Sequence, residues 1–241
     1  VFESMAPKVP LNRPVKARWI THISIMFMNI MILRLMSLAL PFLAVGVALD
    51  AAGLGWAVFR VLDWPLWIKV LLSLFILDFT IWAQHFTTHK VPILWRLHRV
   101  HHADVDFDVS TAIRFHPVEI VLSIPLKIGV VYLLGPIAWA VILFEVVLNG
   151  TALFNQANIT LPAKFERALR CFIVTTDMHR IYQSVQREQH DHNYGFSLSV
   201  WNRLFGTNRG ETATPFVTRL QWQDDRPTEF RLSLWLPFMH K

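Results

Sequence analysis

Long apolar stretches separated by short polar segments dominate the first two thirds of this 241-residue chain. About twenty apolar residues suffice to cross the ~30 Å hydrocarbon core of a bilayer as a helix. The last stretch is broken by Gly135 and Pro136, which end helices and favour a tight hairpin. We therefore expect an all-α integral membrane bundle of about four membrane helices, which can form two hairpins. The apolar stretches cover residues 20–49, 64–83 and 118–153.

The polar segments predict the topology. Residues 1–19 are basic and end at Trp19, a composition typical of the cytosolic side of a membrane. Two crossings before His85 return the chain to that side, and the hairpin of residues 118–153 returns it again. We expect one membrane-embedded domain over residues 1–241, in which residues 20–153 hold the membrane helices and residues 154–241 form a helical cytosolic cap. The tail, residues 229–241, either lies along the membrane interface or packs onto the cap.

Composition supports a membrane protein and excludes other classes. The chain is 54% apolar and only 17% charged, and it has ten Trp and eighteen Phe, which suit contact with lipid. Its net charge of +6 is spread along the polar segments and forms no long basic run, so we do not expect the protein to bind nucleic acid. Anionic lipid headgroups are the expected partners of these basic residues. The single cysteine, Cys171, excludes internal disulfides and cysteine-rich metal sites.

Histidines cluster just past the second apolar stretch, where six of the eleven fall within 32 residues. Neutral imidazole is a ligand for Zn, Cu, Fe and Ni, and residues four apart share one helix face. Two groups with this spacing, nine residues apart, favour a metal site over surface decoration. Asp78, seven residues before His85, is either an acceptor for a ligating imidazole or a buried polar anchor. The six histidines are His85, His89, His98, His101, His102 and His116.

Two familiar kinds of metal site are excluded. His85 and His89 have the spacing of zinc metalloproteases, but Phe86 stands where their catalytic glutamate would be. Ferritin-like di-iron bundles need Glu ligands and Glu-x-x-His pairs, which the sequence lacks. A histidine-rich, carboxylate-poor site beside a membrane remains.

Several motifs, in order over about residues 75–210, resemble the fatty acid hydroxylase and sterol desaturase superfamily. They are Trp82-x-x-His85-x-x-x-His89, Leu97-His98-Arg99-Val100-His101-His102, Arg114-Phe115-His116-Pro117-x-Glu119, Asp177-Met178-His179-Arg180, Asn193-Tyr194-Gly195 and Trp201-Asn202-Arg203-Leu204-Phe205-Gly206.

This resemblance implies a membrane-bound non-haem di-iron oxygenase that hydroxylates or desaturates a lipid, such as a sterol or an acyl chain. Zinc is a possible replacement in isolated protein. An external electron donor is implied, either a reductase, a ferredoxin or a cytochrome. The membrane would be a bacterial inner membrane or the endoplasmic reticulum, with the site on the cytosolic side. The implied ligands are His85, His89, His98, His101, His102 and His179, with His116 and Glu119 as orienting or substrate-positioning groups.

The resemblance breaks at the third histidine box, where the pattern His-x-x-His-His falls on His179, Tyr182 and Gln183. Gln156 also replaces a usual histidine. A neutral amide is a poor substitute for imidazole, and Tyr182 would need a strongly shifted pKa to bind ferric iron as phenolate. His190 and His192 are either replacements or part of a polar surface loop.

Three hypotheses therefore stand: a di-iron lipid oxidoreductase, a catalytically impaired relative that binds lipid or acts as a scaffold, and a mononuclear metal site.

Overall fold

The computed structural model describes Glu3 and residues 7–11, 14–39, 43–51, 53, 55, 57–210, 217–218, 220 and 229–239. Regular structure in these residues is helical, with three isolated β-bridges. The predicted all-α class is confirmed. The helices are α2 (Val15–Ala39), α3 (Leu43–Ala51), α4 (Val58–Val61), α5 (Leu66–Lys90), α6 (Pro92–His102), η1 (Val109–Ile113), α7 (Pro117–Leu134), α8 (Ala138–Asn155), α9 (Ala163–Leu169), α10 (Thr176–Tyr182), α11 (Arg187–His190), α12 (Val200–Leu204), α13 (Phe230–Trp235) and η3 (Leu236–Phe238).

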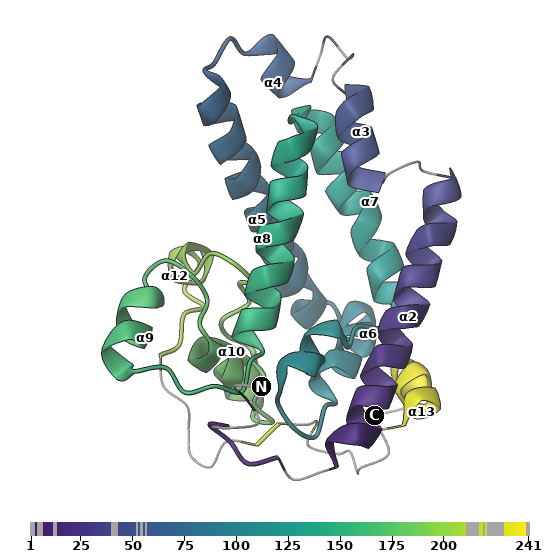
Figure 1. Cartoon of the computed structure of the whole chain (residues 1–241), viewed down its shortest axis with the longest axis vertical. Helices are drawn as coiled ribbons and strands as arrows, with labels where there is room; N and C mark the ends of the chain where they lie inside the picture. Colours follow the sequence, from purple (N-terminus) through teal and green to yellow (C-terminus); the bar gives the residue numbers. More distant parts are fainter. Residues whose placement is uncertain are drawn as a thin grey trace.

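Four helices among the described residues are long and apolar enough to cross a membrane: α2, α5, α7 and α8. They run along the long axis of the molecule (Figure 1). Their outward faces keep large apolar side chains exposed, including Phe27 at 63%, Trp67 at 64% and Val146 at 65%. Because apolar patches of this extent are unfavourable in water, lipid is their natural surroundings and the protein is an integral membrane protein.

The first apolar stretch is not one helix. The described part of residues 20–49 divides into α2, which begins five residues earlier than expected at Val15, and the short α3. Residues 40–42 lie outside the described residues. Ala44 and Ala48 of α3 join Leu77, Val131 and Phe144 in a buried cluster, so α3 packs among α5, α7 and α8.

The predicted hairpin of α7 and α8 is present. Gly135 ends α7 with a φ of 61°, and its N–H bonds the Val131 carbonyl at 2.9 Å. This left-handed cap favours glycine, and Pro136 then prevents the helix from continuing. The turn lies at the end of the bundle near α3 and α4, opposite both termini (Figure 1).

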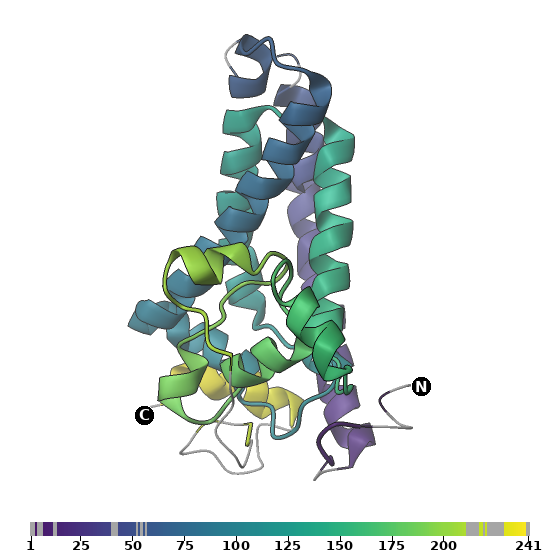
Figure 2. The same ribbon diagram turned by 90° about the vertical axis from the view of Figure 1, so that its left-hand side faces the viewer.

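The cap, built around α9 to α12, lies against the terminal end of the bundle (Figure 2). Trp201 donates its Nε1–H to Asp78 Oδ2 at 2.8 Å, and Trp82 donates to Asn202 Oδ1 at 3.0 Å. These two bonds join α12 to α5. Asp78 accepts a further bond from the Leu198 N–H at 3.2 Å, so it is a buried anchor between membrane helix and cap.

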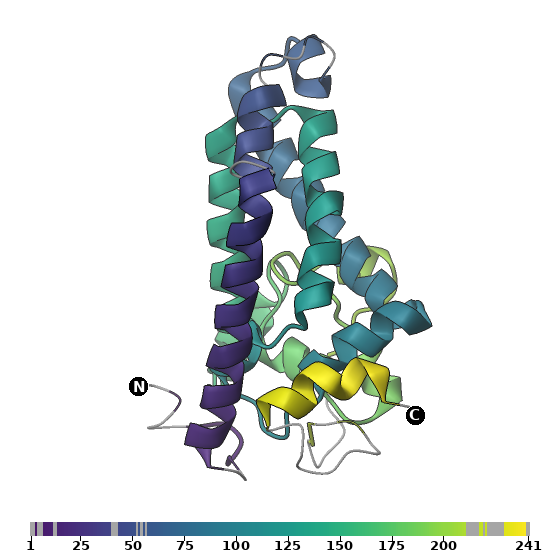
Figure 3. The same cartoon turned by 90° about the vertical axis from the view of Figure 1, so that its right-hand side faces the viewer.

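The described part of the tail packs onto the protein, against α2 and α6. In Figure 3, α13 crosses beside the terminal end of α2. Leu236 is buried in a cluster with Val100 and Ala103, whereas Trp235 and Phe238 remain exposed. His240 lies outside the described residues.

Arg18 is not a surface charge facing lipid headgroups. It is 0% exposed, and its guanidinium binds both carboxylate oxygens of Asp104 at 2.8 and 2.9 Å and Asp108 at 2.7 Å. A planar guanidinium matches two carboxylates in this way because its N–H groups form a fixed fork. The first membrane helix is thereby fixed to the segment that follows the second histidine group. Arg13, also in the basic segment, lies outside the described residues.

Candidate metal centre

The chain reverses between the two histidine groups. Val91 ends α5 and precedes α6, whose first residue is Pro92. Proline disfavours helix at the residue before it and suits the first position of the next helix. The bend brings α6 back against α5, so that the histidines of the two helices face each other.

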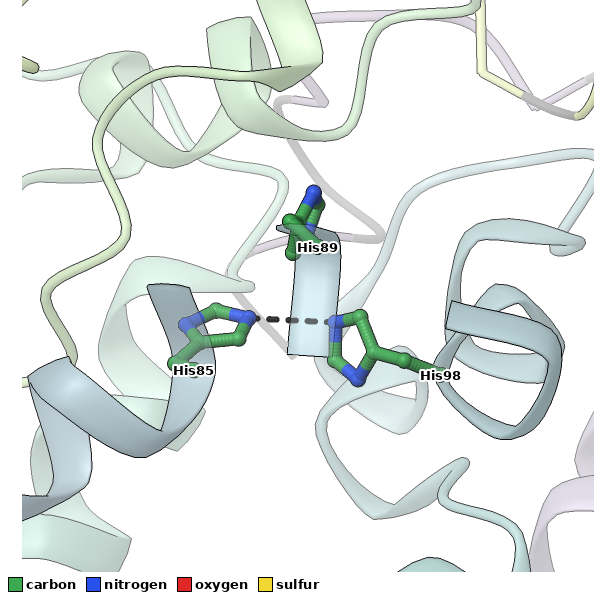
Figure 4. Close-up of side chains that lie close together, drawn as sticks. All are labelled: His85, His89 and His98. Carbon is green, nitrogen blue, oxygen red and sulfur yellow. Dashed lines mark hydrogen bonds between the residues drawn. The ribbon is translucent and has the colours of Figure 1, made fainter. Parts of the chain in front are cut away.

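Imidazoles from both helices converge in the protein interior. His85 and His98 point toward each other with their Nε2 atoms 3.1 Å apart, and His89 lies beside them (Figure 4). The ligand atoms of His85, His89 and His98 all lie within 4.8 Å of one another. All six predicted ligands are buried, at 8% exposure or less.

The hydroxyl of Tyr182 lies among four of these rings. Its Oη is 2.5 Å from His98 Nε2, 2.7 Å from His102 Nε2 and 2.9 Å from His89 Nε2, and it also contacts His85 Nε2. We call His85, His89, His98 and His102 the four-histidine centre. His179, Tyr182 and Gln183 reach the cluster together because they lie at i, i+3 and i+4 at the end of α10.

Acceptors behind the rings fix two of the four imidazoles, and a carboxylate lies near a third. His85 Nδ1 donates to the Tyr194 carbonyl at 2.6 Å, and His98 Nδ1 donates to Glu119 Oε1 at 2.6 Å. His89 Nδ1 lies 3.5 Å from Asp191 Oδ1. Such partners are typical of metal-ligating histidines, because they direct the other ring nitrogen toward the ion.

The charge balance of the centre fits a bound cation. Since His85 and His98 carry their protons on Nδ1, their facing Nε2 atoms both present lone pairs. The Tyr182 hydroxyl has one proton and can satisfy only one of them. A transition-metal ion, which binds neutral imidazole, matches this set of donors.

Burial also shifts the pKa values of groups around the centre. It raises the pKa of Tyr182 well above its ordinary value, assisted by the charges of Glu119 and Asp191. Burial alone would raise the pKa of Asp191, but hydrogen bonds from His89 and Lys90 outweigh it and hold that pKa below its usual range.

His101 and His179 lie to one side of the four-histidine centre and contact glutamines. The Gln156 amide nitrogen is 3.1 Å from His101 Nε2 and 2.7 Å from His179 Nε2. The Gln183 amide nitrogen is 2.6 Å from His101 Nε2. Among the described residues, the buried Nδ1 atoms of both histidines have no hydrogen-bond partner. The two rings therefore differ from those of His85 and His98 on both sides.

The three residues predicted to assist the metal ligands or position the substrate have different surroundings. Glu119 contacts the centre through His98. Asp78 bonds Trp201 and Leu198 of the cap, while the Tyr194 carbonyl takes the proton of His85. His116 caps α7: its Nδ1 accepts from the Val118 N–H, and its Nε2 donates to the Leu234 carbonyl at 3.2 Å. Burial lowers the pKa of His116, in keeping with this neutral tautomer.

Two functional features are not evident from the sequence. Asp191 and the Tyr194 carbonyl hold histidines of α5, although they lie about a hundred residues further along the chain. The carbonyl is placed by a tight turn in which Asn193 has a φ of 56° and its side chain bonds the Met178 carbonyl at 3.0 Å and the backbone of Arg209 at 2.9 Å. The Asn-Tyr-Gly motif was the only sequence signal for it.

His190 lies near the centre, with its ring stacked on Trp95 at 5.3 Å and 5.6 Å from the ring of His102. Its nitrogen, with those of His89 and the carboxylate of Asp191, forms a second group of potential ligands within 4.8 Å. Asp191 is also bound by Lys90 at 2.9 Å. A role for His190 as a replacement ligand stays a prediction.

A cavity of about 320 Å³ extends from the centre among the membrane helices. His85 and His98 form part of its wall, and most of the remainder is apolar, including Met26, Ile30 and Leu148. A second cavity of about 450 Å³ lies beside it between α5, α6 and α7, with Leu94, Leu122 and Leu126 in its wall. The two share four wall residues, namely Gln84, Thr88, Glu119 and Ser123.

The fold and the site together define a class: an integral membrane helical protein with a buried, histidine-rich site suited to a transition metal, open to an apolar cavity. The fatty acid hydroxylase family matches residues 70–207, which is more than half of the chain. The chain belongs to this family, as the motifs predicted.

Curated relatives are distant and longer. The chain is 28% identical over 145 residues to ornithine lipid hydroxylase OlsE of Rhizobium tropici, covering 60% of this chain and 43% of that protein. It is 26% identical over 139 residues to human alkylglycerol monooxygenase, covering 56% and 29%. It is 28% identical over 167 residues to fatty acid hydroxylase vlmA of a Lecanicillium species, covering 61% and 44%. No solved structure matches the chain. The matched region thus spans less than half of each of these relatives.

Proposed function

We propose that this protein is a lipid-directed, O2-dependent oxidoreductase that holds iron at the four-histidine centre. The observation that carries this proposal is the apolar cavity of about 320 Å³, which lies among the membrane helices and ends on His85 and His98. A cavity of this size is within the range of small-molecule sites. Because its wall is mostly apolar, an acyl or isoprenoid chain is the ligand that it suits.

The second cavity offers a route for such a chain. It lies between α5 and α7 and shares wall residues with the first cavity, so a lipid entering between these helices would pass Gln84, Thr88 and Ser123 before reaching the histidines. These polar side chains can bond a hydroxyl or an ester of the substrate, while Leu122 and Leu126 contact its hydrocarbon part.

The residues of the centre would hold and orient the metal. His85, His89, His98 and His102 supply neutral imidazole nitrogens, and Glu119, Asp191 and the Tyr194 carbonyl keep the rings in the required tautomer. Iron bound there would supply the activation of O2 needed to oxidise an unactivated C–H bond. All four rings are buried, which favours a reacting position shielded from bulk water.

The relatives and the surroundings of the site support a lipid substrate. The names ornithine lipid hydroxylase, alkylglycerol monooxygenase and fatty acid hydroxylase all concern lipids. We propose that the centre lies on the cytosolic side, because the basic segment before the first membrane helix favours that side and the described start of α2 lies at the same end of the bundle as the cap (Figure 1). An external reductase, ferredoxin or cytochrome would supply electrons.

Iron content and product formation test the proposal. Detergent-purified protein, reconstituted anaerobically with ferrous iron, should hold at least one iron per chain. With 18O2, a ferredoxin and its reductase, and a total lipid extract, it should yield lipids that gain one 18O or lose two hydrogens. Less than half an iron per chain, or no lipid change with any donor, would count against it.

A cavity variant separates substrate binding from metal binding. Ala152 lines the cavity of about 320 Å³, so Ala152→Phe should fill part of it and abolish lipid oxidation while iron content stays unchanged. The matched control is Ala163→Phe on the exposed face of α9. Equal activity of the two variants would show that the substrate does not use this cavity.

Gln156 and Gln183 favour one alternative, a catalytically impaired relative that binds lipid or acts as a scaffold. Their amides contact His101 and His179, where the family pattern has further imidazoles. In that case the native chain should bind lipid without oxidising it, and restoring histidine at 156, 182 and 183 should create O2-dependent turnover. Oxidation of any lipid by the native chain would exclude this alternative.

A further inference from the structure

We infer that this protein binds a single metal ion, with Tyr182 as a fifth ligand beside the four-histidine centre, and that glutamine amides close the neighbouring position at His101 and His179. The inference rests on the proposed function for the presence of iron, but differs from the di-iron centre that the family resemblance implies.

The contacts of Tyr182 support the first part of the inference, that this residue is a ligand of the metal ion. Its oxygen lies 2.5 to 2.9 Å from the Nε2 atoms of His98, His102 and His89, and it also contacts that of His85. Atoms that share a metal ion through bonds of about 2.0 to 2.1 Å lie roughly 3 Å from each other. The facing Nε2 atoms of His85 and His98, at 3.1 Å, have that separation. The ligand atoms of His85, His89 and His98 lie within 4.8 Å of one another, so an ion held by these three rings has the phenol oxygen as its next neighbour, with His102 on the far side of that oxygen.

A protonated phenol cannot satisfy this environment alone. It donates one hydrogen bond, yet His85 and His98 each direct a lone pair at it. A bound cation would resolve the conflict, because it accepts electron pairs from the rings and favours the phenolate over the phenol.

The contacts of Gln156 and Gln183 support the second part of the inference, that no second metal ion binds at His101 and His179. A side-chain amide has two N–H donors, and that of Gln156 reaches both His101 Nε2 and His179 Nε2, while Gln183 adds a donor to His101. The lone pairs that a second ion would need are thus already engaged by hydrogen bonds. Two imidazoles with neutral amides also form a much weaker site than a full histidine set.

The surroundings of Nδ1 in His101 and His179 also indicate that these rings do not bind a second ion. In the four-histidine centre, Nδ1 of His85 and His98 donates to an oxygen behind the ring. In the part of the chain that the structure describes, no acceptor lies behind the buried Nδ1 atoms of His101 and His179. These two imidazoles therefore lack the acceptor that typically orients a metal-ligating ring.

Metal counting tests the inference directly. Protein loaded anaerobically with excess ferrous iron and then desalted should hold one iron per chain by elemental analysis. Two irons per chain would overturn the inference while leaving the proposed function intact. Fewer than half an iron per chain would overturn both.

Spectroscopy tests the ligand. After oxidation by air, a ferric–phenolate bond should give a visible charge-transfer absorption that is lost in Tyr182→Phe, although that variant keeps one iron. Tyr194→Phe is the matched control, because its ring lies beside that of His85 and its hydrogen bond to His85 comes from the backbone carbonyl, which the substitution keeps. Absence of the band from the native protein, or its persistence in Tyr182→Phe, would exclude Tyr182 as a ligand.

Restoring histidines at the second metal position, beside His101 and His179, completes the test. The double substitution Gln156→His and Gln183→His should raise the iron content from one toward two per chain. Gln189→His is the control, since this buried glutamine bonds Gln186 instead of a ring nitrogen. An unchanged count in a double variant that elutes as a monodisperse species would show that the amides do not close the position.

Discussion

The histidines of the centre are directed by oxygens that come from distant parts of the chain. His85 is the clearest case, because the Tyr194 carbonyl, 109 residues further along the chain, accepts its Nδ1–H at 2.6 Å. The Asp191 carboxylate lies 3.5 Å from Nδ1 of His89 and is itself held by Lys90. A ligating imidazole that loses such a partner can rotate and is less basic, which weakens the metal bond. Residues that touch no metal can therefore control its affinity.

Asp191→Asn should weaken iron binding by about tenfold, because a neutral amide oxygen orients His89 less firmly than a carboxylate. The measurement is the dissociation constant from competition with a chelator. Glu188→Gln, a nearby exposed carboxyl, is the control and should leave the constant unchanged. Equal dissociation constants for the two variants would show that Asp191 does not affect iron binding.

At the scale of the element, two sharp turns place the site and the helices that hold it. The Val91-Pro92 bend sets α6 against α5, and the Gly135-Pro136 turn sets α8 against α7. Gly135 is needed twice over: its φ is 61°, and a Cβ there would lie 2.5 Å from the Cβ of Ala57. Gly129, within α7, has no atom within 4 Å of such a Cβ.

Gly135→Ala should destabilise the protein by more than the roughly 1 to 2 kcal/mol cost of a left-handed residue, because the clash with Ala57 adds to it. Gly129→Ala, the matched control, should be neutral or stabilise by about 0.5 to 1 kcal/mol. Thermal unfolding in detergent compares the two. A Gly135→Ala protein as stable as the Gly129→Ala protein would show that this turn is not under constraint.

At the scale of the whole molecule, the sequence predicted the helical membrane class and the family, because apolar length and local histidine spacing are properties of neighbouring residues. It did not predict the break between α2 and α3, nor that Arg18 pairs with Asp104, 86 residues away. The role of the Tyr194 carbonyl could not be predicted either, because every residue has a backbone carbonyl and the sequence does not distinguish one from another. Contacts set by tertiary packing are therefore the part that the sequence could not supply.

Arg18 fixes the first membrane helix to the site, so its loss should affect the entire fold. Arg18→Ala leaves Asp104 and Asp108 buried without their cation, at a cost of about 3 to 5 kcal/mol. We expect a marked fall in melting temperature and in iron content. Lys16→Ala, an exposed cation on the same helix, should change neither quantity. Similar melting temperatures for the two variants would contradict a structural role for the buried pairs.

X-ray absorption at the iron edge tests the central claim most directly, because it counts the imidazoles around the metal. The account predicts iron surrounded by four imidazole nitrogens and one oxygen, with a loss of imidazole scattering in His98→Ala. An oxygen-only shell, or a spectrum that His98→Ala leaves unchanged, would contradict it.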